Sequence, residues 1–550
     1  MKELEEKIFE LALRNSLIHQ GKANPGSVLG SLVSQNPEIK EKIKEIKPKI
    51  DEIVGKVNKM TLEEQKEEAE KRGVSLEVES KEEVDLPPLP NAEKGKVVMR
   101  LAPFPSGPLH IGNARTYIIN DEYARRYNGK LYLVIDDTIG SEKKLIIKDA
   151  YDLIPEGFKW LGISYEKVFY KSDRMEIYYK YAEEIIKKGK AYVCECKSDE
   201  MRKNRAEGTE CTHRNQSIGE NLEKWKKMLD PKGYKEGEAV VRLKTDMKNP
   251  NPAFRDRVLL RISEREHPRV GKKYRVWPLL EFSWAIDDYL LGITHILRGK
   301  DLMMESEMER YIWDIFGWKH AEFLYTGLAR IEGVKLSKSK AQKEVQSGEY
   351  SGWDDPRTWS LQSLRKRGIM PEAVRAFCVH LGMSLSDVTV PVEKLYSENR
   401  KLIDSVANRY FFVSEPVEIS LDKKFSDARA PLHPQDTKRG IRNIPVGEKI
   451  YIEKKDFEKL KGKEVRLLHL CNIILDKKSK VTSTDIKDVP KIHWVSNRNI
   501  RVRVVMPDAS EIEGLAEPDF AKEKTNNIIQ FERFGFCRID SKGVCYFAHK

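Results

Sequence analysis

The fold is decided by residues 97–113, which read VVMRLAPFPSGPLHIGN. The first five residues are apolar or β-branched apart from Arg100, a composition typical of a short buried strand. Proline and glycine then interrupt the strand, and a helical pattern runs from about 113 to 127. A second apolar run, YLVI at 132–135, follows that helix. Strand, helix and strand in this order predict a parallel βαβ unit.

The turn between the first strand and the helix favours nucleotide binding. Free backbone N–H groups and the helix dipole both attract phosphate oxygens at such a junction. Gly112 would let a nucleotide approach the backbone without a Cβ in the way. His110 could donate a hydrogen bond to a phosphate oxygen as charge develops on it. Taken alone, HIGN at 110–113 is more often an ordinary turn with a histidine that caps the helix.

A second motif, KLSKSK at 335–340, follows Gly333. Its three lysines, with serines between them, could hold a triphosphate and stabilise charge at the reacting phosphorus. Taken alone, such a segment is more often a solvated surface loop. The two motifs begin about 225 residues apart, and each lies near an expected strand–helix junction.

Four metal-ligand residues form two close pairs, Cys194 with Cys196 and Cys211 with His213. Two such pairs, about 15 residues apart, suit tetrahedral zinc, and the alternative is three buried thiols beside a surface histidine. Because all four positions would be filled by protein, the zinc is expected to be structural. Seven cysteines, an odd number spread along the chain, argue against a disulfide framework. The isolated thiols are expected in hydrophobic cores, at Cys378, Cys471, Cys537 and Cys545.

Length and charge restrict the class of protein. The chain has 550 residues, a formal net charge of +12 and a pI of about 9.0. At roughly 100–200 residues per domain, three to five domains are expected. A basic chain suits a polyanion such as nucleic acid, and a merely solvated basic surface is the alternative. No stretch approaches the roughly 20 apolar residues of a membrane span, and the N-terminus lacks a signal-peptide pattern. We therefore expect a cytoplasmic protein with no membrane partner.

Patterning along the chain divides it further. Helical patterns occupy residues 1 to about 80, and a proline-rich segment at 82–96 is typical of a linker. Strand patterns at 239–243 and 258–262 indicate an inserted module. Short alternating strands from about 415 onward predict one or two β-barrels. Within them, QFERFGFCR at 530–538 combines aromatic and basic residues that can bind unpaired RNA bases, although such aromatics are more often barrel core.

Taken together, the two motifs resemble those of class I aminoacyl-tRNA synthetases, with 110–113 as the HIGH-type motif and 335–339 as the KMSKS-type motif. Longer segments resemble the archaeal-type glutamyl-tRNA synthetases over essentially the whole chain. These segments are RLAPFPSGPLH at 100–110, DDT at 136–138, AIDD at 285–288, LGITHILRGKD at 291–301, WDDPRTWSLQSLRKRG at 353–368 and GKANPG at 21–26.

The resemblance implies a reaction in which glutamate, ATP and tRNA give glutamyl-tRNA, AMP and diphosphate through glutamyl-adenylate. Mg²⁺ would assist, and no side chain would form a covalent bond. His110, Asn113, Lys335 and Lys338 would be catalytic through positioning and charge stabilisation. His110, Gly112, Asn113 and Lys338 would bind ATP.

Family position also implies the residues that bind glutamate. Arg100 would pair with the side-chain carboxylate, Asp136 with the ammonium group and Arg298 with the other anionic end, while Ser106 would hydrogen-bond nearby. The chemistry agrees, because a substrate with two carboxylates and one ammonium group requires cations for the former and an anion for the latter. For each arginine the alternative is an ion pair at the end of a strand.

Three positions depart from the family pattern. The first motif ends in Asn113 rather than histidine, a variation that glutamyl enzymes commonly show, and asparagine can still donate a hydrogen bond. Ile139 stands where the family usually has aspartate, which removes a polar contact. Leu280 stands where many relatives carry a tyrosine that touches the substrate side chain.

The implied architecture is a Rossmann-type α/β catalytic domain with an inserted module, a helical domain, a C-terminal all-β barrel region and a helical N-terminal extension. The expected parts are the N-terminal extension (1–82), a linker (83–96), the first catalytic half (97–190), the acceptor-binding module with a zinc knuckle (191–275), the second catalytic half with the KMSKS-type loop (276–345), the helical domain (346–412) and the anticodon-binding barrels (413–550).

Three alternatives share parts of this pattern. A glutaminyl-tRNA synthetase has the same architecture but usually reads Pro-Asn-Gly where this chain has Pro-Ser-Gly at 105–107. A small-molecule nucleotidyltransferase lacks a long basic tail, and a non-catalytic tRNA-binding paralogue would not need His110, Lys335 and Lys338. The expected partners are L-glutamate and a glutamate-accepting tRNA, with glutamine tRNA left open, and the chain is expected to be a monomer.

Overall fold

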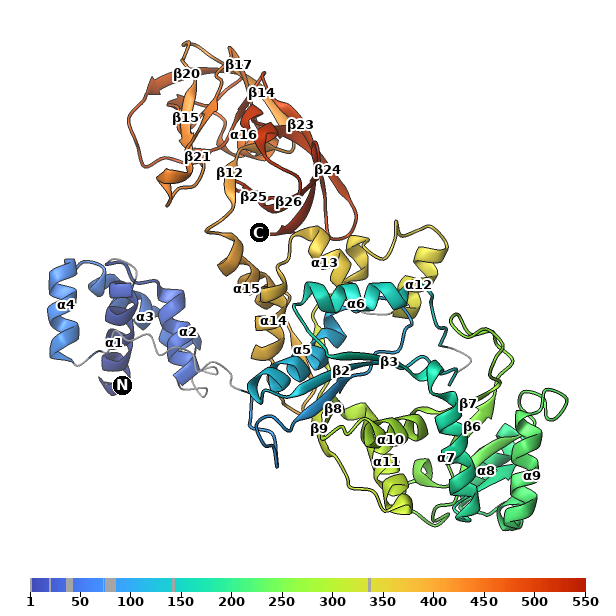
Figure 1. Cartoon of the computed structure of the whole chain (residues 1–550). Helices are drawn as coiled ribbons and strands as arrows, with labels where there is room; N and C mark the ends of the chain where they lie inside the picture. The colour runs from blue at the N-terminus through green and yellow to red at the C-terminus, as the bar shows by residue number, and fades with distance from the viewer. Residues whose placement is uncertain are drawn as a thin grey trace. The chain divides into compact units, whose positions relative to one another are not determined.

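The structure is a computed structural model that describes residues 2–18, 21–35, 43–72, 74, 86–140, 144–334 and 338–550 (Figure 1). The chain forms two compact units, Met1–Asp85 and Leu86–Lys550. Net charge differs between them, since residues 1–85 sum to −4 and residues 86–550 to +16. The excess of basic residues therefore belongs entirely to the second unit.

The first unit is helical, as the sequence predicts. Apolar side chains of the first three helices form its core. Two polar side chains hold the loop before the second helix: Asn58 Oδ1 accepts from Ala23 N–H at 2.6 Å, and Gln65 Nε2 donates to Gly21 O at 3.0 Å. The helices are α1 (Lys2–Ile18), α2 (Pro25–Gln35), α3 (Ile43–Val57) and α4 (Leu62–Lys71).

A parallel sheet forms the centre of the second unit. Strands β1 (Val98–Leu101), β2 (Lys130–Ile135) and β3 (Lys167–Tyr170) pair in that order, and β8 (His295–Gly299) pairs with β9 (Glu322–Thr326). The residue before β8 joins the two groups, because Thr294 N–H donates to Val98 O at 2.9 Å. The strands therefore run in the order β9-β8-β1-β2-β3.

Helices cover both faces of this sheet (Figure 1). On one face, Met99 and Leu133 pack with α5 (Ile111–Arg126) and α6 (Ala150–Trp160). On the other face, Ile296 packs with α7 (Met175–Lys187), α10 (Leu280–Leu290) and α11 (Met303–Phe316). A parallel sheet with helices on both faces confirms the predicted Rossmann-type α/β fold.

The inserted module carries an antiparallel sheet. Its strands lie in the order β4 (Ala191–Cys194), β5 (Val240–Leu243), β6 (Val258–Ile262) and β7 (Val276–Pro278). The associated helices are η2 (Lys171–Asp173) before the module, α8 (Ser198–Glu207), η3 (Thr212–Asn215), α9 (Ile218–Leu229), η4 (Pro252–Phe254) and, after it, η5 (Lys300–Leu302).

Helices follow the catalytic sheet and lead to two sheets of seven strands each, which confirm the expected barrel region. The helical segment contains β10 (Ala329–Ile331), α12 (Lys338–Gln346), η6 (Pro356–Thr358), α13 (Leu361–Arg367), α14 (Pro371–His380), β11 (Val388–Val390) and α15 (Glu393–Ile403). One barrel sheet has the order β12 (Asn408–Tyr410), β25 (Ile528–Phe531), β26 (Gly535–Ser541), β27 (Val544–His549), β23 (Ile500–Val505), β24 (Glu511–Ala516) and β13 (Phe412–Val413). The other has the order β21 (Lys491–Ile492), β18 (Glu464–Leu467), β19 (Asn472–Ile474), β20 (Lys478–Ser483), β14 (Pro416–Leu421), β17 (Lys449–Glu453) and β22 (Val495–Ser496). A hairpin of β15 (Ala428–Pro431) and β16 (Ile441–Ile444), with η7 (Thr437–Arg439), α16 (Lys454–Leu460) and η8 (Pro518–Lys522), completes the region.

Two expectations about cores are confirmed. Phe531 and Phe536 are fully buried in the hydrophobic cores, so these aromatics belong to the core alternative rather than to an RNA-stacking surface. The four isolated cysteines are buried and free. Within the described residues, every helix is too short or too polar to span a lipid bilayer.

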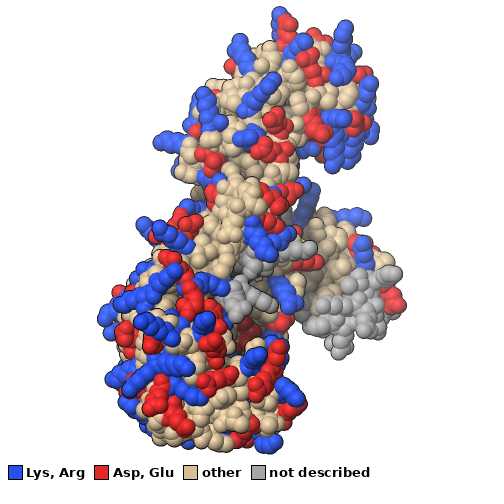
Figure 2. Space-filling view, turned by 90° about the vertical axis from the view of Figure 1, so that its right-hand side faces the viewer, with Lys and Arg blue, Asp and Glu red and all other residues tan. Residues whose placement is uncertain are grey.

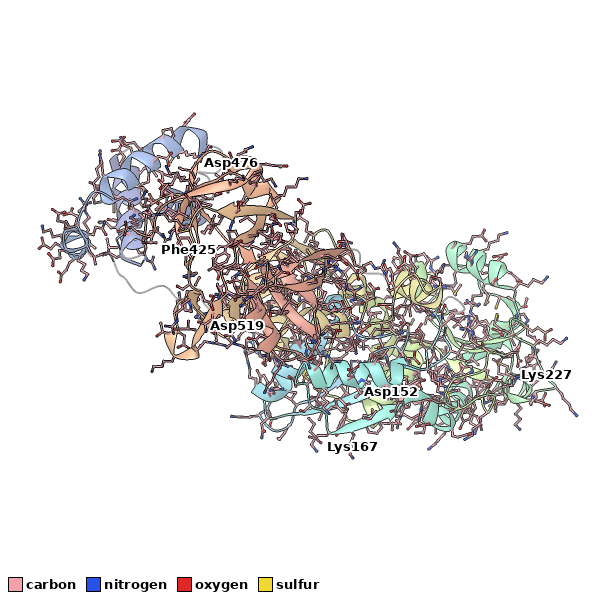
Figure 3. All side chains as sticks on the ribbon, turned by 90° about the horizontal axis from the view of Figure 1, so that it is seen from above. Asp152, Lys167, Lys227, Phe425, Asp476 and Asp519 are labelled. Carbon is pink, nitrogen blue, oxygen red and sulfur yellow. The ribbon has the colours of Figure 1, made fainter. Side chains whose placement is uncertain are left out.

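Charged side chains lie mostly outside the cores. On the face shown in Figure 2, basic and acidic side chains are interspersed rather than gathered into a field of one sign. Figure 3 shows Lys167 and Lys227 at the periphery of the second unit, and both residues are exposed. The buried charges are therefore exceptions that require partners.

Candidate active site and metal site

The carboxyl ends of the parallel strands bring together the residues that the sequence predicts for the amino acid. The chain leaves β1 toward β2 and leaves β8 toward β9, so these two neighbours form the switch point at which open α/β sheets bind ligands. Arg100 lies near the end of β1, Arg298 lies near the end of β8, and Asp136 follows β2 directly. Ser106 is half-buried in the turn after β1.

Arg100 forms a buried ion pair with Asp288 of α10. Its Nη2 donates to Asp288 Oδ2 at 2.7 Å, and its Nε donates to Oδ1. Arg100 is 6% exposed and Asp288 1%. Burial alone would lower the pKa of Arg100, but attraction to Asp288 raises it above its usual value. The pair uses two of the three guanidinium nitrogens, which leaves Nη1 outside it.

Arg298 forms a second buried pair, with Glu309 of α11. Its Nη1 lies 2.6 Å from Glu309 Oε1, its Nη2 lies 3.2 Å from Oε2, and Nη1 also donates to Ser306 Oγ at 3.3 Å. Glu309 is fully buried, and burial raises its pKa to about 7 against the attraction of Arg298. The two pairs adjoin, because Arg298 Nη2 lies 3.8 Å from Asp288 Oδ2.

Asp136 forms a third pair, with Lys171 of η2. The Lys171 ammonium lies 2.9 Å from Asp136 Oδ1 and donates to Ser283 Oγ at 2.8 Å. Both charged side chains are buried. Asp136 therefore already faces one ammonium group, and the same carboxylate is the predicted partner of the substrate ammonium group.

The indole ring of Trp284 connects the three pairs. Guanidinium carbons of Arg298 and Arg100 lie 4.4 and 4.9 Å from its centroids, and Lys171 Nζ lies 5.1 Å away. These distances are within the range of cation–π attraction. We call the six charged residues around this ring the charge cluster: Arg100, Asp136, Lys171, Asp288, Arg298 and Glu309.

Half of the charge cluster carries no role in the sequence prediction. Asp288 falls in one of the quoted family segments, but the resemblance implies no function for it. Glu309 and Lys171 carry no motif, since each is an ordinary charged residue in a helical stretch. Their importance follows only from the three-dimensional pairing, in which each predicted ligand residue has one buried partner of opposite charge.

The HIGH-type motif forms the N-terminus of α5. His110 is the N-cap: its Nδ1 accepts from Gly112 N–H at 3.1 Å, and Asn113 Oδ1 accepts from His110 N–H at 2.9 Å. The capping alternative from the sequence is thus present in the fold. This capping is compatible with the predicted hydrogen bond to phosphate, because Nδ1 as acceptor assigns the proton of a neutral imidazole to Nε2.

A segment of the helical region holds this motif in place. His110 forms an antiparallel bridge with Ser360, and Leu361 N–H donates to Leu109 O at 2.9 Å. Gly107 has φ +142°, and a Cβ there would lie 3.1 Å from the ring of Trp353. The positive φ and this close approach both favour glycine at position 107.

The KMSKS-type motif falls mostly beyond the described part of the chain. Lys335 lies outside the described residues. Of Lys338, only the backbone lies within them, as the first residue of α12. Among the other departures, Ile139 is 3% exposed and belongs to a hydrophobic core, and Leu280 begins α10.

The Cys/His residues converge in the inserted module as the sequence predicts. The ligand atoms of Cys194, Cys196, Cys211 and His213 all lie within 4.8 Å of one another. The Sγ atoms of Cys194 and Cys211 are 3.8 Å apart, and Cys196 Sγ is 3.4 Å from His213 Nδ1. Tetrahedral zinc with bonds of about 2.0–2.3 Å places its ligands about 3.5–3.8 Å apart, so these residues fit the ion.

Neighbouring side chains complete the metal site. Arg242 is 1% exposed, and its Nη1 lies 3.7 Å from Cys194 Sγ and 3.9 Å from Cys211 Sγ. The Glu195 carboxylate lies 3.4 Å from His213 Nε2, on the side of the ring opposite to the cysteines. The hydrogen bond between Cys194 and Cys211 lowers the pKa of Cys211 and raises that of Cys194, so this pair favours one thiolate.

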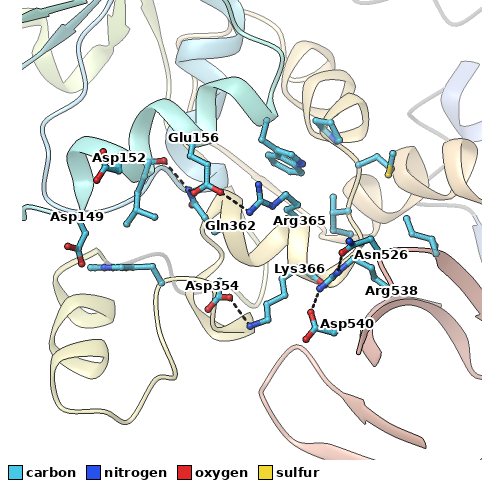
Figure 4. Close-up of a pocket in the computed structure, with 18 residues that line it drawn as sticks. Asp149, Asp152, Glu156, Asp354, Gln362, Arg365, Lys366, Asn526, Arg538 and Asp540 are labelled. Atoms are coloured by element: carbon cyan, nitrogen blue, oxygen red, sulfur yellow. Dashed lines mark hydrogen bonds and ion pairs between the residues drawn. The ribbon is translucent and has the colours of Figure 1, made fainter. Parts of the chain in front are cut away.

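A cavity of about 1070 Å³ lies away from the strand ends, between α6, residues 353–371 and strands β25 and β26 (Figure 4). Its lining contains more acidic than basic side chains, which disfavours phosphate. Among the described residues, none of the predicted active-site residues lines it. The ion pairs in its wall are Arg365–Glu156, Lys366–Asp354 and Arg538–Asp540. The residues predicted to bind the amino acid therefore lie at the strand ends and not in this cavity.

The Rossmann-type sheet, with the first motif at a helix N-terminus, agrees with the resemblance to class I aminoacyl-tRNA synthetases. The family model described as tRNA synthetases class I (E and Q), catalytic domain, matches residues 96–405. Two models described as anti-codon binding domain of the same group match residues 407–491 and 491–540. The chain belongs to this family of class I tRNA synthetases for glutamate and glutamine.

Full-length relatives agree with the family. A glutamate–tRNA ligase of Pyrococcus furiosus is 46% identical over 579 aligned positions, and one of Pyrococcus abyssi is 45% identical over 577. A glutamate–tRNA ligase of Methanocaldococcus jannaschii is 43% identical over 565. Each alignment covers 100% of this chain and 100% of the relative.

Proposed function

We propose that this chain is a glutamate–tRNA ligase that works through a glutamyl-adenylate. The glutamate α-carboxylate attacks the α-phosphorus of ATP, and diphosphate leaves. The terminal ribose hydroxyl of tRNA then attacks the mixed anhydride, and AMP leaves. The observation that carries the proposal is the pair of buried arginines at the switch point, Arg100 and Arg298, in a chain that aligns end to end with ligases named for glutamate.

The charge cluster suits the amino acid. We assign the side-chain carboxylate to Arg100, whose Nη1 lies outside the Asp288 pair, and the other anionic end to Arg298. Asp136 would receive the ammonium group, and Ser106 would add a hydrogen bond. Charge-assisted hydrogen bonds in a buried site are strong enough to select glutamate over neutral glutamine.

The first motif suits the nucleotide. His110 Nε2 would donate to a phosphate oxygen, while Gly112 and Asn113 would line the adenosine side of the site. Lys335 and Lys338 would hold the phosphates and stabilise the charge of the transition state. Mg²⁺, carried on the ATP phosphates, would neutralise the charge of the leaving diphosphate.

The metal site suits structural zinc. Cys194, Cys196, Cys211 and His213 would supply all four ligands, which leaves no open position for chemistry. A bound zinc would fix the loops that join β4 to α9. The module spanning 191–275 would then present a rigid surface to the acceptor end of tRNA.

The remaining assignments follow the division expected from the sequence. The N-terminal extension (1–82), the helical domain (346–412) and the barrels (413–550) would surround the catalytic halves, and the barrels would bind the anticodon. The matched anti-codon binding models support the last assignment. A monomeric cytoplasmic enzyme is the form that we propose, with glutamate tRNA as its polyanionic substrate.

ATP–diphosphate exchange with glutamate or glutamine, each with and without tRNA, tests the function. Strong preference for glutamate is expected. Equal rates with glutamine would replace the proposal by a glutaminyl-tRNA synthetase, which the same family models also describe. Lys338→Ala should lower adenylate formation by about 10²–10³ while tRNA binding stays nearly intact. Unchanged exchange in this variant would refute the role of the second motif.

A further inference from the structure

When all six groups are ionised, the charge cluster is balanced before any substrate binds. It contains three cations, on Arg100, Lys171 and Arg298, and three carboxylates, on Asp136, Asp288 and Glu309. All six residues are at most 6% exposed. Glutamate would bring a net charge of −1 into this closed space at neutral pH, whereas glutamine would bring none. A buried unit charge without compensation is costly, so the cluster needs a way to offset it.

Glu309 is the member of the cluster best placed to offset the added charge. It pairs with Arg298 from α11, whereas the predicted substrate residues lie at or next to strand ends. The charged groups that face it are Arg298 of β8, Asp288 of α10 and Arg100 of β1. Asp288 therefore already disfavours its ionised form, and a substrate carboxylate on Arg298 would do so further.

Charged residues elsewhere around α11 are engaged with other partners. Glu305, one turn before Glu309 on the same helix, lies 3.3 Å from Arg257. In the neighbouring turn η5, Lys300 lies 2.9 Å from Asp387. Neither of these pairs contributes a counter-charge to Glu309, whose salt-bridge partner is Arg298.

We propose that Glu309 is a positioning residue that takes up a proton when glutamate enters the site, so that binding of glutamate, but not of glutamine, is coupled to its protonation. This inference rests on the proposed amino-acid site. In the balanced equation, one glutamate and one proton from solvent enter together, and the net charge of the cluster with its ligand stays at zero. Arg298 exchanges part of its bond to Glu309 for a bond to the substrate.

The resting state of Glu309 makes this uptake feasible near neutral pH. Burial has already raised its pKa to about 7, so that the proton is available at little cost. Above pH 7 the free site is increasingly ionised, and binding must then include protonation. The affinity for glutamate is therefore expected to fall about tenfold per pH unit above pH 7, whereas the affinity for glutamine stays flat.

Isothermal titration of the full-length chain with glutamate measures the coupling directly. At pH 8, titrations in phosphate and in Tris differ in heat by the number of protons taken up multiplied by the difference in buffer ionisation enthalpy. For the wild-type chain we expect about one proton per glutamate and none per glutamine. Glutamine also controls for the substrate ammonium group, because both amino acids carry it.

Two variants locate the proton. Glu309→Gln should bind glutamate with no buffer-dependent heat and with a flat affinity between pH 6.5 and 8.5. The matched control is Glu517→Gln in the barrels, because Glu517 is also fully buried beside an arginine, Arg442, and burial also raises its pKa to about 7. That control should keep the proton uptake of the wild-type chain.

The possible outcomes distinguish failure of this inference from failure of the proposed function. Wild-type glutamate binding without buffer dependence, or uptake that persists in Glu309→Gln, overturns the inference and leaves the ligase assignment intact. An Arg298→Lys variant with unchanged glutamate affinity would instead overturn the site itself. If Glu309→Gln does not fold, the pH dependence of the wild-type KM for glutamate still tests whether a proton is taken up, and a flat profile overturns the inference.

Discussion

The charge cluster and the metal site are both groups of buried polar side chains, but they differ in what satisfies these side chains. In the charge cluster every group already has a protein partner of opposite charge, supplied by strands and helices between Arg100 and Glu309. In the metal site four ligand atoms face one another, with Arg242 beside two of the thiols. The charge cluster is therefore compensated by the protein alone, whereas the metal site would gain its stability from a bound ion.

Loss of the metal should therefore have the largest effect. Cys196→Ala removes one of four ligands, and the remaining three should not retain zinc during dialysis. Structural zinc contributes on the order of 10 kcal/mol of binding energy in small peptides, and that energy is coupled to folding. The wild-type chain should contain about one zinc per molecule by elemental analysis, and the variant less than a tenth.

The control for this experiment is Cys378→Ala, which removes an equally buried thiol far from the metal site in the sequence. It should keep its zinc. Protease digestion should cut the 191–275 module of Cys196→Ala first. If wild-type protein prepared in metal-containing buffer holds no zinc, the metal site is misassigned and no longer differs from the charge cluster in needing an ion.

Breaking one ion pair of the charge cluster should have the next largest effect. Arg100→Gln removes the nearer counter-charge of the buried Asp288 and leaves only Arg298 at 3.8 Å, and breaking a buried pair typically costs about 3–5 kcal/mol. Glutamate activity should be nearly lost, and the gap to glutamine should narrow because Gln offers both a donor and an acceptor. Urea unfolding and exchange kinetics measure the two effects.

The double variant Arg100→Gln with Asp288→Asn separates stability from recognition. It restores a neutral hydrogen-bonded pair, so most of the lost stability should return. The preference for glutamate should not return with it. If selectivity also recovers, Arg100 does not contact the substrate side chain, and Arg298 becomes the next candidate.

The contrast also explains what the sequence could predict. The metal ligands lie within 20 residues of one another, so their spacing alone indicates a site, and the chain brings them together by one short sheet and two helices. The strand at 97–101, the helix after it and the barrel strands were likewise predictable, since each depends on local periodicity. Arg100, Asp136 and Arg298 were identified only through their motif context.

Asp288, Lys171 and Glu309 were not predictable as site residues. Each is brought to the crevice by packing between elements that are distant in sequence, and no local pattern marks a carboxylate that will be buried. Glu309 occupies a helical position where a glutamate ordinarily faces water. Only the burial of α11 against α10 turns it into a partner of Arg298. The unpredicted half of the cluster is therefore the half that depends on tertiary structure.

The buried carboxylate of Glu309 should make the stability of the protein depend on pH. The folded-state pKa of Glu309 is about 7, above the ordinary 4.5, so the folded state holds its proton more tightly than the unfolded state does. The contribution of Glu309 to the free energy of unfolding is full below pH 4.5 and is lost as the pH rises through 7. At about 1.4 kcal/mol per pKa unit, the loss approaches about 3 kcal/mol.

Glu309→Gln should remove that dependence, because glutamine does not titrate. The difference in unfolding free energy between pH 5 and pH 8 should shrink by about 3 kcal/mol relative to the wild type, as measured by urea unfolding at both pH values. In this variant Arg298 still has a counter-charge, because the Asp288 carboxylate lies 3.8 Å from it. An unchanged pH dependence would mean that Glu309 is ionised in the fold at both values.

The smallest effect should come from a residue that touches the metal site without binding the ion. The Glu195 carboxylate lies 3.4 Å from His213 Nε2, while Nδ1 of the same ring faces Cys196. A carboxylate in this position holds the histidine tautomer whose Nδ1 is available to the metal, and its loss typically costs 10–100-fold in metal affinity. Glu195→Gln should therefore weaken zinc binding by about that factor in a chelator competition, whereas Glu207→Gln, on the exposed face of α8, should not. Retention of full affinity in Glu195→Gln would show that the four ligands alone orient the ring, and the metal site would then need no partner from outside its ligand set, unlike the charge cluster.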